Sequence, residues 1–322
     1  MIVLVFTGGT ISMRHDPAAG GAVPTLRGAA ILASAPGAAE IAELSVEEWA
    51  TMPGAHLTVD QMWALRGRLA ELVARDDVDG VVVAQGTDTI EETSYLTYRS
   101  LRTEKPIVFT GAMRTSDDVG WDGPSNLTDA VRVAASPALR GYGTVVVFNS
   151  RVYSAGDVTK VETAFLDAFD SPGLGPVAVV DAGCVVVRRA LAGGRPVLAP
   201  TAPAGPVDIV YAYAGAEGRL LDAARVDGKG VVVAALGRGN TPTGIYEGIK
   251  RWLAESKPVV VTSRVPNGRV APIYGFPGGG ASLHAAGAIL AGNLRPQQAR
   301  LDLMLALGAG LSGDRLAAVF ES

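Results

Sequence analysis

The sequence contains a single cysteine and few charged residues. Cys184 is the one cysteine among 322 residues, so the chain cannot form an internal disulfide. We expect its thiol to pack as a small core side chain and not to act as a nucleophile. Charged residues make up 19% and hydrophobic residues 48%, a composition that argues against disorder and supplies a sizeable core.

Basic residues are not in excess, and long apolar runs are missing. The net charge of −4 and the pI near 5.5 argue against nucleic acid or an anionic membrane as the main partner. No stretch reaches the roughly 18 to 20 apolar residues of a membrane-spanning helix. Ile2–Phe6 lacks a preceding basic region and runs directly into Thr7, which predicts a buried strand and no signal peptide. We therefore expect a cytoplasmic protein.

Histidine is scarce as well. His15, His56 and His284 lie far apart in the sequence, without the spacing of metal ligands. The sequence therefore predicts no metal site.

Short apolar runs alternate with helical patterns in the first half of the chain. Strands are predicted at Ile2–Phe6, Gly80–Ala84, Pro106–Thr110 and Thr144–Phe148 because these runs are continuously apolar, as in a buried parallel sheet. Helices are predicted from a capping box at Thr58 and Gln61 to about Arg75, and at Thr89–Leu101 and Ser125–Ala135. This alternation is typical of right-handed βαβ units.

The composition changes near residue 191. Residues 191–206 are rich in Gly, Ala and Pro, including Gly193 and Gly194, which predicts a linker. Beyond it, strands are predicted at Val207–Tyr213, Gly230–Leu236 and Pro258–Ser263, and helices at Pro242–Ala254, Leu283–Ala291 and Pro296–Leu307. We expect a catalytic α/β domain in residues 1–190 and a smaller α/β domain in residues 207–322.

Polar turns follow two of the predicted strands, where ligands bind in an open parallel sheet. Thr7-Gly8-Gly9-Thr10 offers hydroxyls and approachable backbone N–H groups, although a plain glycine turn or an anion nest fits equally well. Gln85-Gly86-Thr87-Asp88-Thr89 opens a helix, so helix capping is its simplest explanation. Both turns would nevertheless face the same crevice at the carboxyl ends of the strands, which makes helix capping alone a less satisfactory explanation.

A third polar segment is Gly156-Asp157-Val158-Thr159-Lys160. A single lysine is usually a solvated surface charge. When it is desolvated beside a threonine hydroxyl, however, its amine can act as a base.

With these clusters, the sequence resembles the bacterial-type L-asparaginase/glutaminase family over nearly its whole length. The resemblance rests on Phe6–Ile11, Gln85–Ser94, Thr110–Arg114, Asp122–Leu127, Gly156–Lys160, Gly237–Asn240, Ser263–Val265 and Asn293–Arg300. It implies a larger flavodoxin-like N-terminal domain with a parallel sheet and a smaller Rossmann-like C-terminal domain. It also implies a homodimer or homotetramer in which a neighbouring C-terminal domain closes each active site.

The resemblance further implies a reaction, the hydrolysis of the side-chain amide of asparagine without a cofactor. Thr10 would be the nucleophile that forms an acyl-enzyme, while Lys160 would ease proton removal through Thr87. Asp88 would receive the α-ammonium of the substrate, a charge pair that is stronger in a closed site than in water. The positions implied to surround the substrate are Gly9, Gly54, Ala55, Gly86, Asp88 and Ala112.

The sequence departs from the family pattern where substrate is recognised and threonine is activated. The family's loop tyrosine is missing from Arg14–Pro24, and its best match is Ala22 or Val23. His15 or Asp16 could replace it as a loop-borne base, although a surface position explains each of them more simply.

Substrate recognition is affected in two places. The family's carboxylate-binding serine and the polar residue after it correspond to Gly54 and Ala55. No acidic residue in Asn267–Gly280 matches the glutamate that the family's smaller domain lends to a neighbouring site.

These departures leave three options for the site, namely slower but ordinary hydrolysis, a different small amide, or ligand binding with little turnover. Among other function classes, a non-catalytic amino-acid-binding protein competes with the hydrolase. A subunit of a tRNA-dependent amidotransferase ranks last, because we expect no extra domain ahead of Thr7 and the pI is acidic. Asparagine and glutamine are not distinguished, since they differ by one methylene.

Overall fold

The computed structural model describes residues 1–191 and 195–321, which form two compact units. The units are Met1–Val197 and Leu198–Ser322. Gly193 and Gly194 of the predicted linker lie outside the described residues.

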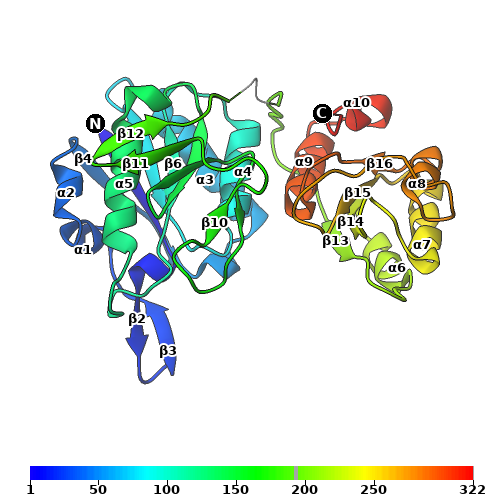
Figure 1. Cartoon of the computed structure of the whole chain (residues 1–322), viewed down its shortest axis with the longest axis horizontal. Coiled ribbons are helices and arrows are strands. Elements are labelled where there is room, and N and C mark those ends of the chain that lie inside the picture. Colours follow the sequence, from blue (N-terminus) through cyan, green and yellow to red (C-terminus); the bar gives the residue numbers. More distant parts are fainter. Residues whose placement is uncertain (192–194, 322) are drawn as a thin grey trace. The chain divides into compact units, whose positions relative to one another are not determined.

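The larger unit is built on an eight-stranded sheet with the strand order β12-β11-β8-β7-β6-β5-β1-β4 (Figure 1). Strands β4, β1, β5, β6 and β7 are parallel, while β8, β11 and β12 continue the sheet in antiparallel pairing. The strand bounds are β1 Ile2–Gly8, β4 Leu44–Met52, β5 Gly80–Ala84, β6 Ile107–Thr110, β7 Thr144–Phe148, β8 Arg151–Ser154, β11 Ala178–Asp181 and β12 Cys184–Val187.

Helices cover both faces of this sheet. Side chains of β1 alternate, so that Ile2, Leu4 and Phe6 pack in one core cluster and Val3 and Val5 in another. The first cluster includes residues of α1, α2 and α5, and the second includes residues of α3 and α4. The helix bounds are α1 Gly28–Ala33, α2 Pro36–Ala39, α3 Val59–Ala74, α4 Ile90–Ser100 and α5 Gly123–Ala135.

The order of the parallel strands reverses at β1. The chain passes from β1 outward to β4 and then crosses to β5 on the other side of β1. This is the flavodoxin-like order, in which ligands bind outside the carboxyl ends of the strands where the order reverses. The two threonine-rich turns follow β1 and β5, so both stand at this switch point. The predicted α/β class and flavodoxin-like larger domain are confirmed.

The smaller unit contains a four-stranded parallel sheet in the order β13-β14-β15-β16. Apolar residues of β13, β14 and β15 pack with Leu221, Ile249 and Trp252 in one core cluster. The bounds are β13 Val207–Tyr211, α6 Arg219–Arg225, β14 Gly230–Ala235, α7 Thr243–Ala254, β15 Val259–Ser263, α8 Gly280–Ala285, β16 Ile289–Leu290, α9 Pro296–Gly308 and α10 Gly313–Ala317. The prediction that the smaller domain has an α/β fold is confirmed.

Two sequence-based predictions need correction. The helix predicted at Leu283–Ala291 is wrong, because α8 ends at Ala285 and Ile289–Leu290 pairs with β15 as a strand. Cys184 is not a core residue but an exposed one, since it begins the short outermost strand β12, which pairs on one side only. Leu44–Met52, for which no strand was predicted, forms the edge strand β4, where two of its side chains are acidic.

The segment Arg14–Pro24 forms a β-hairpin. Strands β2 (Met13–Asp16) and β3 (Gly21–Pro24) pair antiparallel and project from the larger unit (Figure 1). Loop residues Ser116 and Asp117 hold the base of the hairpin, because Ser116 donates to the Met13 carbonyl and Asp117 accepts from the backbone N–H of His15. The Thr115 hydroxyl, followed by the His15 N–H, lowers the pKa of Asp117 and favours its charged form.

Candidate active site

The first turn after β1 is shaped by two glycines. Gly8 and Gly9 have φ values of 101° and 83°, a backbone region that favours glycine, and they direct the chain into the 3-10 turn Thr10–Ser12. The Thr7 hydroxyl donates to the Ala84 carbonyl at 3.2 Å and so fastens β1 to β5. Thr10 is a partly exposed residue at the start of that 3-10 turn.

The turns that contain Gly9, Gly54 and Gly86 pack against one another through their glycine backbones. A Cβ built on Gly9 would lie 2.2 Å from the Cα of Gly86, and one built on Gly86 would lie 2.7 Å from the Cα of Gly54. Side chains at these positions would overlap the neighbouring backbone. The turn that carries Thr10 therefore lies directly against the turn that carries Thr87.

The second turn does more than cap a helix. Thr89 occupies the N-cap position of α4 but makes no side-chain capping bond; its hydroxyl donates to the Gly54 carbonyl at 2.9 Å. The Gln85 amide donates to the hydroxyls of Thr89 and Thr93, which holds the turn internally. Thr87 is buried, whereas the side chain of Asp88 is 61% exposed.

Lys160 joins this turn from far along the chain. Its Nζ donates to Thr87 Oγ1 at 2.8 Å and to Asp88 Oδ1 at 3.0 Å. Its side chain is 20% exposed, so the contact with Thr87 is largely shielded from water. A threonine hydroxyl, an amine and a carboxylate therefore share one cluster, an arrangement able to move a proton and to hold a cation.

Glu91 positions the backbone beside Lys160. Its Oε2 accepts from the Lys160 backbone N–H at 2.8 Å and from the Thr159 hydroxyl. Strand β9 (Thr159–Lys160), which also pairs with β10 (Phe169–Asp170), is thereby held against the start of α4. Glu91 stands inside the second threonine motif, but its role was not predicted, because the sequence does not show that Thr159 lies beside it.

The turn after β6 forms the third side of the cluster. A Cβ on Gly111 would lie 2.4 Å from the Gln85 carbonyl and 3.4 Å from Thr87 Cγ2, so this turn packs against the second one. The side chain of Ala112 belongs to the hydrophobic core, which leaves only its backbone to meet a ligand. Asp122 accepts from the backbone N–H groups of Met113 and Arg114 and fixes the turn.

A cavity of about 440 Å³ opens beside the cluster. Asp88, Glu91, Lys160 and Glu162 line it. Its volume is within the usual range for small-molecule sites, but neither Thr10 nor Thr87 is among the residues that line it.

The remaining predicted residues are placed differently. Ala55 is exposed in the 3-10 turn Gly54–His56, and its Gly54 neighbour has no room for a side chain because a Cβ would lie 2.9 Å from the Gly86 carbonyl oxygen. His15 and Ala22 are exposed and face each other across the hairpin. Asp16 Oδ1 accepts from the Ala18 backbone N–H at the hairpin turn.

Two family models cover the chain. The model described as "Asparaginase, N-terminal" matches residues 1–192, and that described as "Glutaminase/Asparaginase C-terminal domain" matches residues 206–320. The chain belongs to the bacterial-type asparaginase family.

Similar proteins span the whole length of this asparaginase family member. A probable L-asparaginase of Deinococcus radiodurans is 39% identical over 323 aligned residues, covering 99% of this chain and 96% of the relative. An L-asparaginase of Bacillus licheniformis is 32% identical and covers 97% of each chain. Among solved structures, the probable cytoplasmic L-asparaginase of Campylobacter jejuni has a TM-score of 0.88 at 31% identity, covering 99% of this chain and 98% of that one.

The chain is thus an L-asparaginase-like amidohydrolase. Within residues 1–191 and 195–321, no group of three or more His, Cys, Asp or Glu side chains is arranged to hold a metal ion. None of the helices in this part of the chain is both long and apolar enough to cross a bilayer.

Proposed function

We propose that the chain hydrolyses the side-chain amide of L-asparagine to L-aspartate and ammonia through an acyl-enzyme on Thr10. The observation that supports this most strongly is the pair of hydrogen bonds from Lys160 Nζ to Thr87 and Asp88. These bonds bring Lys160 from β9 to the turn that follows β5, more than 70 residues earlier in the chain.

The first step is attack by the Thr10 hydroxyl on the amide carbon. An amide is a poor electrophile, so the hydroxyl proton has to be accepted and the leaving ammonia has to be protonated. Thr87 and Lys160 are proposed to make both transfers, since the turns that carry Thr10 and Thr87 pack together and Lys160 Nζ lies 2.8 Å from Thr87 Oγ1. In the second step, water attacks the Thr10 ester and releases aspartate.

Asp88 is proposed to hold the α-ammonium of the substrate. Its exposed carboxylate faces the cavity beside Lys160, where an incoming cation can reach it. An α-ammonium bound there would compete with Lys160 Nζ for Asp88 Oδ1, which now accepts from the amine at 3.0 Å.

The backbone around Gly9, Gly86 and Ala112 is proposed to contact the substrate. Glycine turns bring backbone N–H groups within reach of a ligand, and such groups stabilise the oxyanion that forms during attack. The close packing of Gly9 on Gly86 supports this, since it makes the turns rigid.

A related candidate is the hydrolysis of an amide whose α-carboxylate is altered or absent. It is favoured by the crowding at Gly54, which leaves no space for a carboxylate-binding side chain, and by the exposed methyl group of Ala55. β-Alaninamide is asparagine without its α-carboxylate, and it therefore separates the two candidates. A kcat/KM for β-alaninamide equal to or above that for asparagine would favour the second candidate.

The proposed reaction is tested by trapping its intermediate. Purified protein is mixed with asparagine, quenched in acid within milliseconds, and digested for mass spectrometry. An aspartyl ester on the peptide that contains Thr10 is expected in the wild type and is absent from Thr10→Ala. If asparagine is hydrolysed while the ester forms elsewhere, Thr10 is not the nucleophile. Tight aspartate binding without any turnover would instead favour a non-catalytic amino-acid-binding protein.

We also propose that the protein acts in the cytoplasm as a homodimer or homotetramer. Similarity to the probable cytoplasmic enzyme of Campylobacter jejuni supports the location. Light scattering coupled to size-exclusion chromatography tests the assembly, which would be wrong if the chain of 33.1 kDa eluted as a monomer with full activity.

A further inference from the structure

A second cavity lies in the larger unit, away from Thr10 and Thr87. It has a volume of about 510 Å³, and all of its lining residues belong to Met1–Val197. One of them is Thr144, the first residue of β7, which is parallel to its neighbours β6 and β5. The cavity therefore lies at the amino-terminal ends of the parallel strands, whereas the catalytic cluster lies at their carboxyl ends.

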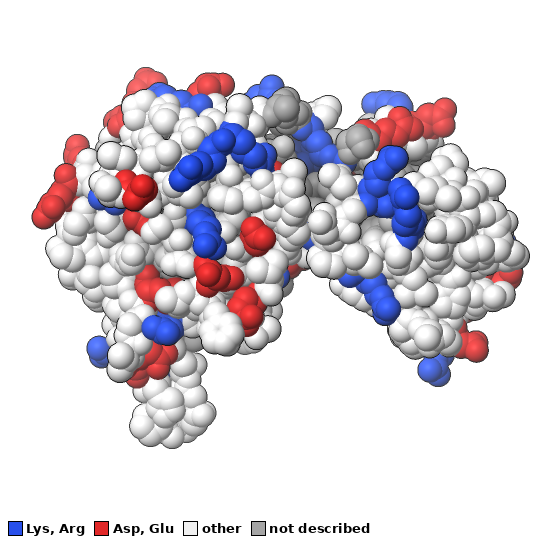
Figure 2. All heavy atoms as spheres, in the orientation of Figure 1, with Lys and Arg blue, Asp and Glu red and all other residues white. Residues whose placement is uncertain are grey.

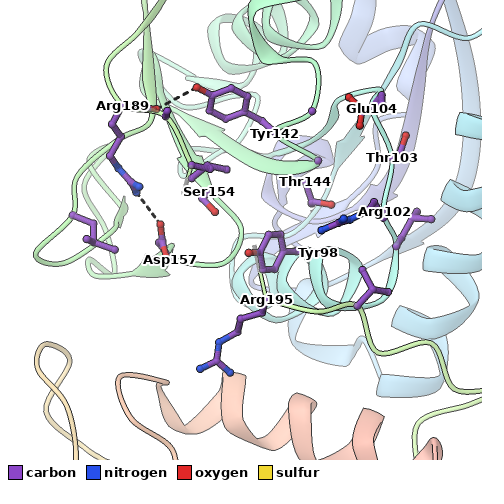
Figure 3. A pocket seen from close by; sticks show the side chains of 17 residues that line it. Tyr98, Arg102, Thr103, Glu104, Tyr142, Thr144, Ser154, Asp157, Arg189 and Arg195 are labelled. Atoms are coloured by element: carbon purple, nitrogen blue, oxygen red, sulfur yellow. Dashed lines mark hydrogen bonds and ion pairs between the residues drawn. The ribbon is translucent and has the colours of Figure 1, made fainter. Parts of the chain in front are cut away.

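The cavity contains hydrogen-bond donors without acceptors. The Thr144 hydroxyl is buried, its residue is 1% exposed, and it has no hydrogen-bond partner in the described part of the chain. The Arg102 guanidinium likewise makes no hydrogen bond or ion pair with any described residue. In Figure 3 the side chains of Arg102, Thr144 and Tyr98 gather in the same part of the cavity, whereas that of Arg195 points away.

An unpaired buried hydroxyl costs free energy that a ligand can recover. A buried polar group without a partner destabilises a protein by roughly 1–3 kcal/mol, and such groups are rare in native folds. A ligand oxygen beside Thr144 would satisfy the hydroxyl.

The charges of the cavity favour an anion. Asp157 is paired with Arg189 at 2.8 Å, so its carboxylate is already compensated. Burial raises the pKa of Tyr98, so its phenol carries no negative charge that would oppose an anion. Glu104 is the other lining carboxylate, and both it and Arg102 are exposed to solvent. Figure 2 shows acidic and basic side chains mixed over the visible face of the larger unit, so recognition depends on the local guanidinium and not on a large basic surface.

We propose that this cavity is a second ligand site that binds a small organic anion, with Arg102 pairing to a carboxylate or phosphate group and Thr144 donating to one of its oxygens. Guanidinium groups match both kinds of oxyanion in planar, bidentate geometry. The volume suits a small metabolite.

The cavity is connected to the catalytic cluster by a short segment of chain. Ser154 Oγ accepts from the backbone N–H of Gly156, and a Cβ on Gly156 would lie 3.0 Å from the ring of Tyr98. Asp157, which lines the cavity, precedes Lys160 by three residues. A ligand that shifts this segment would also move Lys160. Binding in the cavity is therefore proposed to change the rate of turnover; this part of the inference rests on the proposed function.

Binding is measured by isothermal titration calorimetry on the full chain with inorganic phosphate and with succinate, and 1,4-butanediol serves as the uncharged analogue of succinate. Saturable binding of at least one anion is expected, together with none of the diol. Binding of phosphate alone assigns the site to phosphate compounds, and binding of succinate alone assigns it to carboxylates.

Two variants locate the binding. Arg102→Gln and Thr144→Val are expected to weaken it at least 10-fold, while Arg315→Gln, which removes the same charge from an exposed position in the smaller unit, leaves it unchanged. Thr144→Val is expected to keep or raise Tm, because the hydroxyl it removes has no partner. The absence of saturable binding for both anions, or unchanged binding in Arg102→Gln, would overturn the site.

Regulation is measured separately as ammonia release at saturating asparagine, with and without the bound anion. A change in kcat of at least twofold is expected for the wild type, and no change for Arg102→Gln. Unchanged turnover with proven binding would overturn the regulatory role. A protein that is inactive under all conditions would count against the proposed function, whereas the calorimetry would still decide the site.

Discussion

The backbone N–H of Lys160 donates to Oε2 of Glu91 at 2.8 Å, and this bond joins the strand that carries the lysine to the first turn of α4. The same oxygen accepts from Thr159, so one carboxylate holds two consecutive residues. Glu91 therefore positions the backbone of Lys160, and we expect it to influence the proposed reaction through that lysine.

Glu91→Gln is expected to lower kcat by about 10- to 100-fold, since a displacement of about 1 Å at a reacting group costs that much. The amide keeps one acceptor but loses the charge that strengthens both bonds. KM for asparagine should change far less than kcat, because Asp88 is untouched. Glu40→Gln, on an exposed helix-end residue, is the control. Equal falls in kcat for both variants, or a change confined to KM, would show that Glu91 does not position Lys160.

Gly54→Ser tests whether the carboxylate-binding serine of the family can be restored. Its Cβ would lie 2.9 Å from the Gly86 carbonyl oxygen and 3.0 Å from the Gly86 Cα, so the glycine contact has to open. We expect the free energy of unfolding to fall by about 1–3 kcal/mol, as for other overpacked sites. Ala55→Ser is the matched control, and it should leave stability unchanged because Ala55 is exposed. Chemical denaturation measures both variants, and a fully stable Gly54→Ser with a lower KM would refute the crowding argument.

The hairpin of β2 and β3 lacks the loop tyrosine of the family. His15 and Ala22 face each other on β2 and β3, and the hairpin tip beyond Asp16 carries no charged side chain. If neither His15 nor Asp16 serves as a base, His15→Ala and Asp16→Ala keep kcat within about twofold, whereas Ala22→Tyr or Val23→Tyr raises it by supplying a proton carrier. Steady-state ammonia release measures all four variants. A loss of kcat above 10-fold in His15→Ala would identify that histidine as the replacement.

Asp129 gives a prediction for stability against pH. Burial raises the pKa of this carboxyl, although the hydrogen bond from Ser150 and then the charge of Arg132 act in the opposite direction. A raised folded-state pKa means that the folded protein binds the proton more tightly than the unfolded chain. The ionised carboxylate of Asp129 therefore lowers the free energy of unfolding. This loss grows as pH rises from about 4 through the folded-state pKa and is constant above it.

Asp129→Asn removes this titration while keeping an acceptor for Ser150. The difference in Tm between Asp129→Asn and the wild type should thus become more favourable to the variant as pH rises through that window. Thermal unfolding between about pH 4 and pH 8 measures it. A difference that is flat, or that falls with rising pH, would contradict a raised pKa for Asp129.

The buried parallel strands were predictable because their sequences are continuously apolar and β-branched. Gly80–Ala84 and Thr144–Phe148 have the predicted bounds, and the Thr58–Gln61 capping box is present at the start of α3. The edge strand β4 escaped prediction, because half-exposed edge positions tolerate the acidic residues Glu47 and Glu48. Cys184 was wrongly predicted to be a core residue. Its exposure follows from its place on an edge strand that pairs on one side only, which the residue type does not show.

At the site, the motifs that follow β1 and β5 were predictable from the rule that ligands meet the carboxyl ends of parallel strands. The contact of Gly54 with Gly86 was not, because it joins two turns that are separated by a strand and a helix. The role of Glu91 was hidden as well, since it depends on β9 lying along α4. The catalytic roles of Thr10, Thr87, Asp88 and Lys160 stay predictions until activity is measured.

Ammonia release from L-asparagine by the wild type, Thr10→Ala and Thr87→Ala tests the proposed mechanism most directly. The wild type is expected to release equal amounts of aspartate and ammonia. Losses in kcat of roughly 10³-fold or more are expected for Thr10→Ala and of about 10²- to 10⁴-fold for Thr87→Ala, with native circular dichroism in both. Wild-type turnover that persists undiminished in Thr10→Ala, or no ammonia from asparagine, glutamine and β-alaninamide alike, would contradict it.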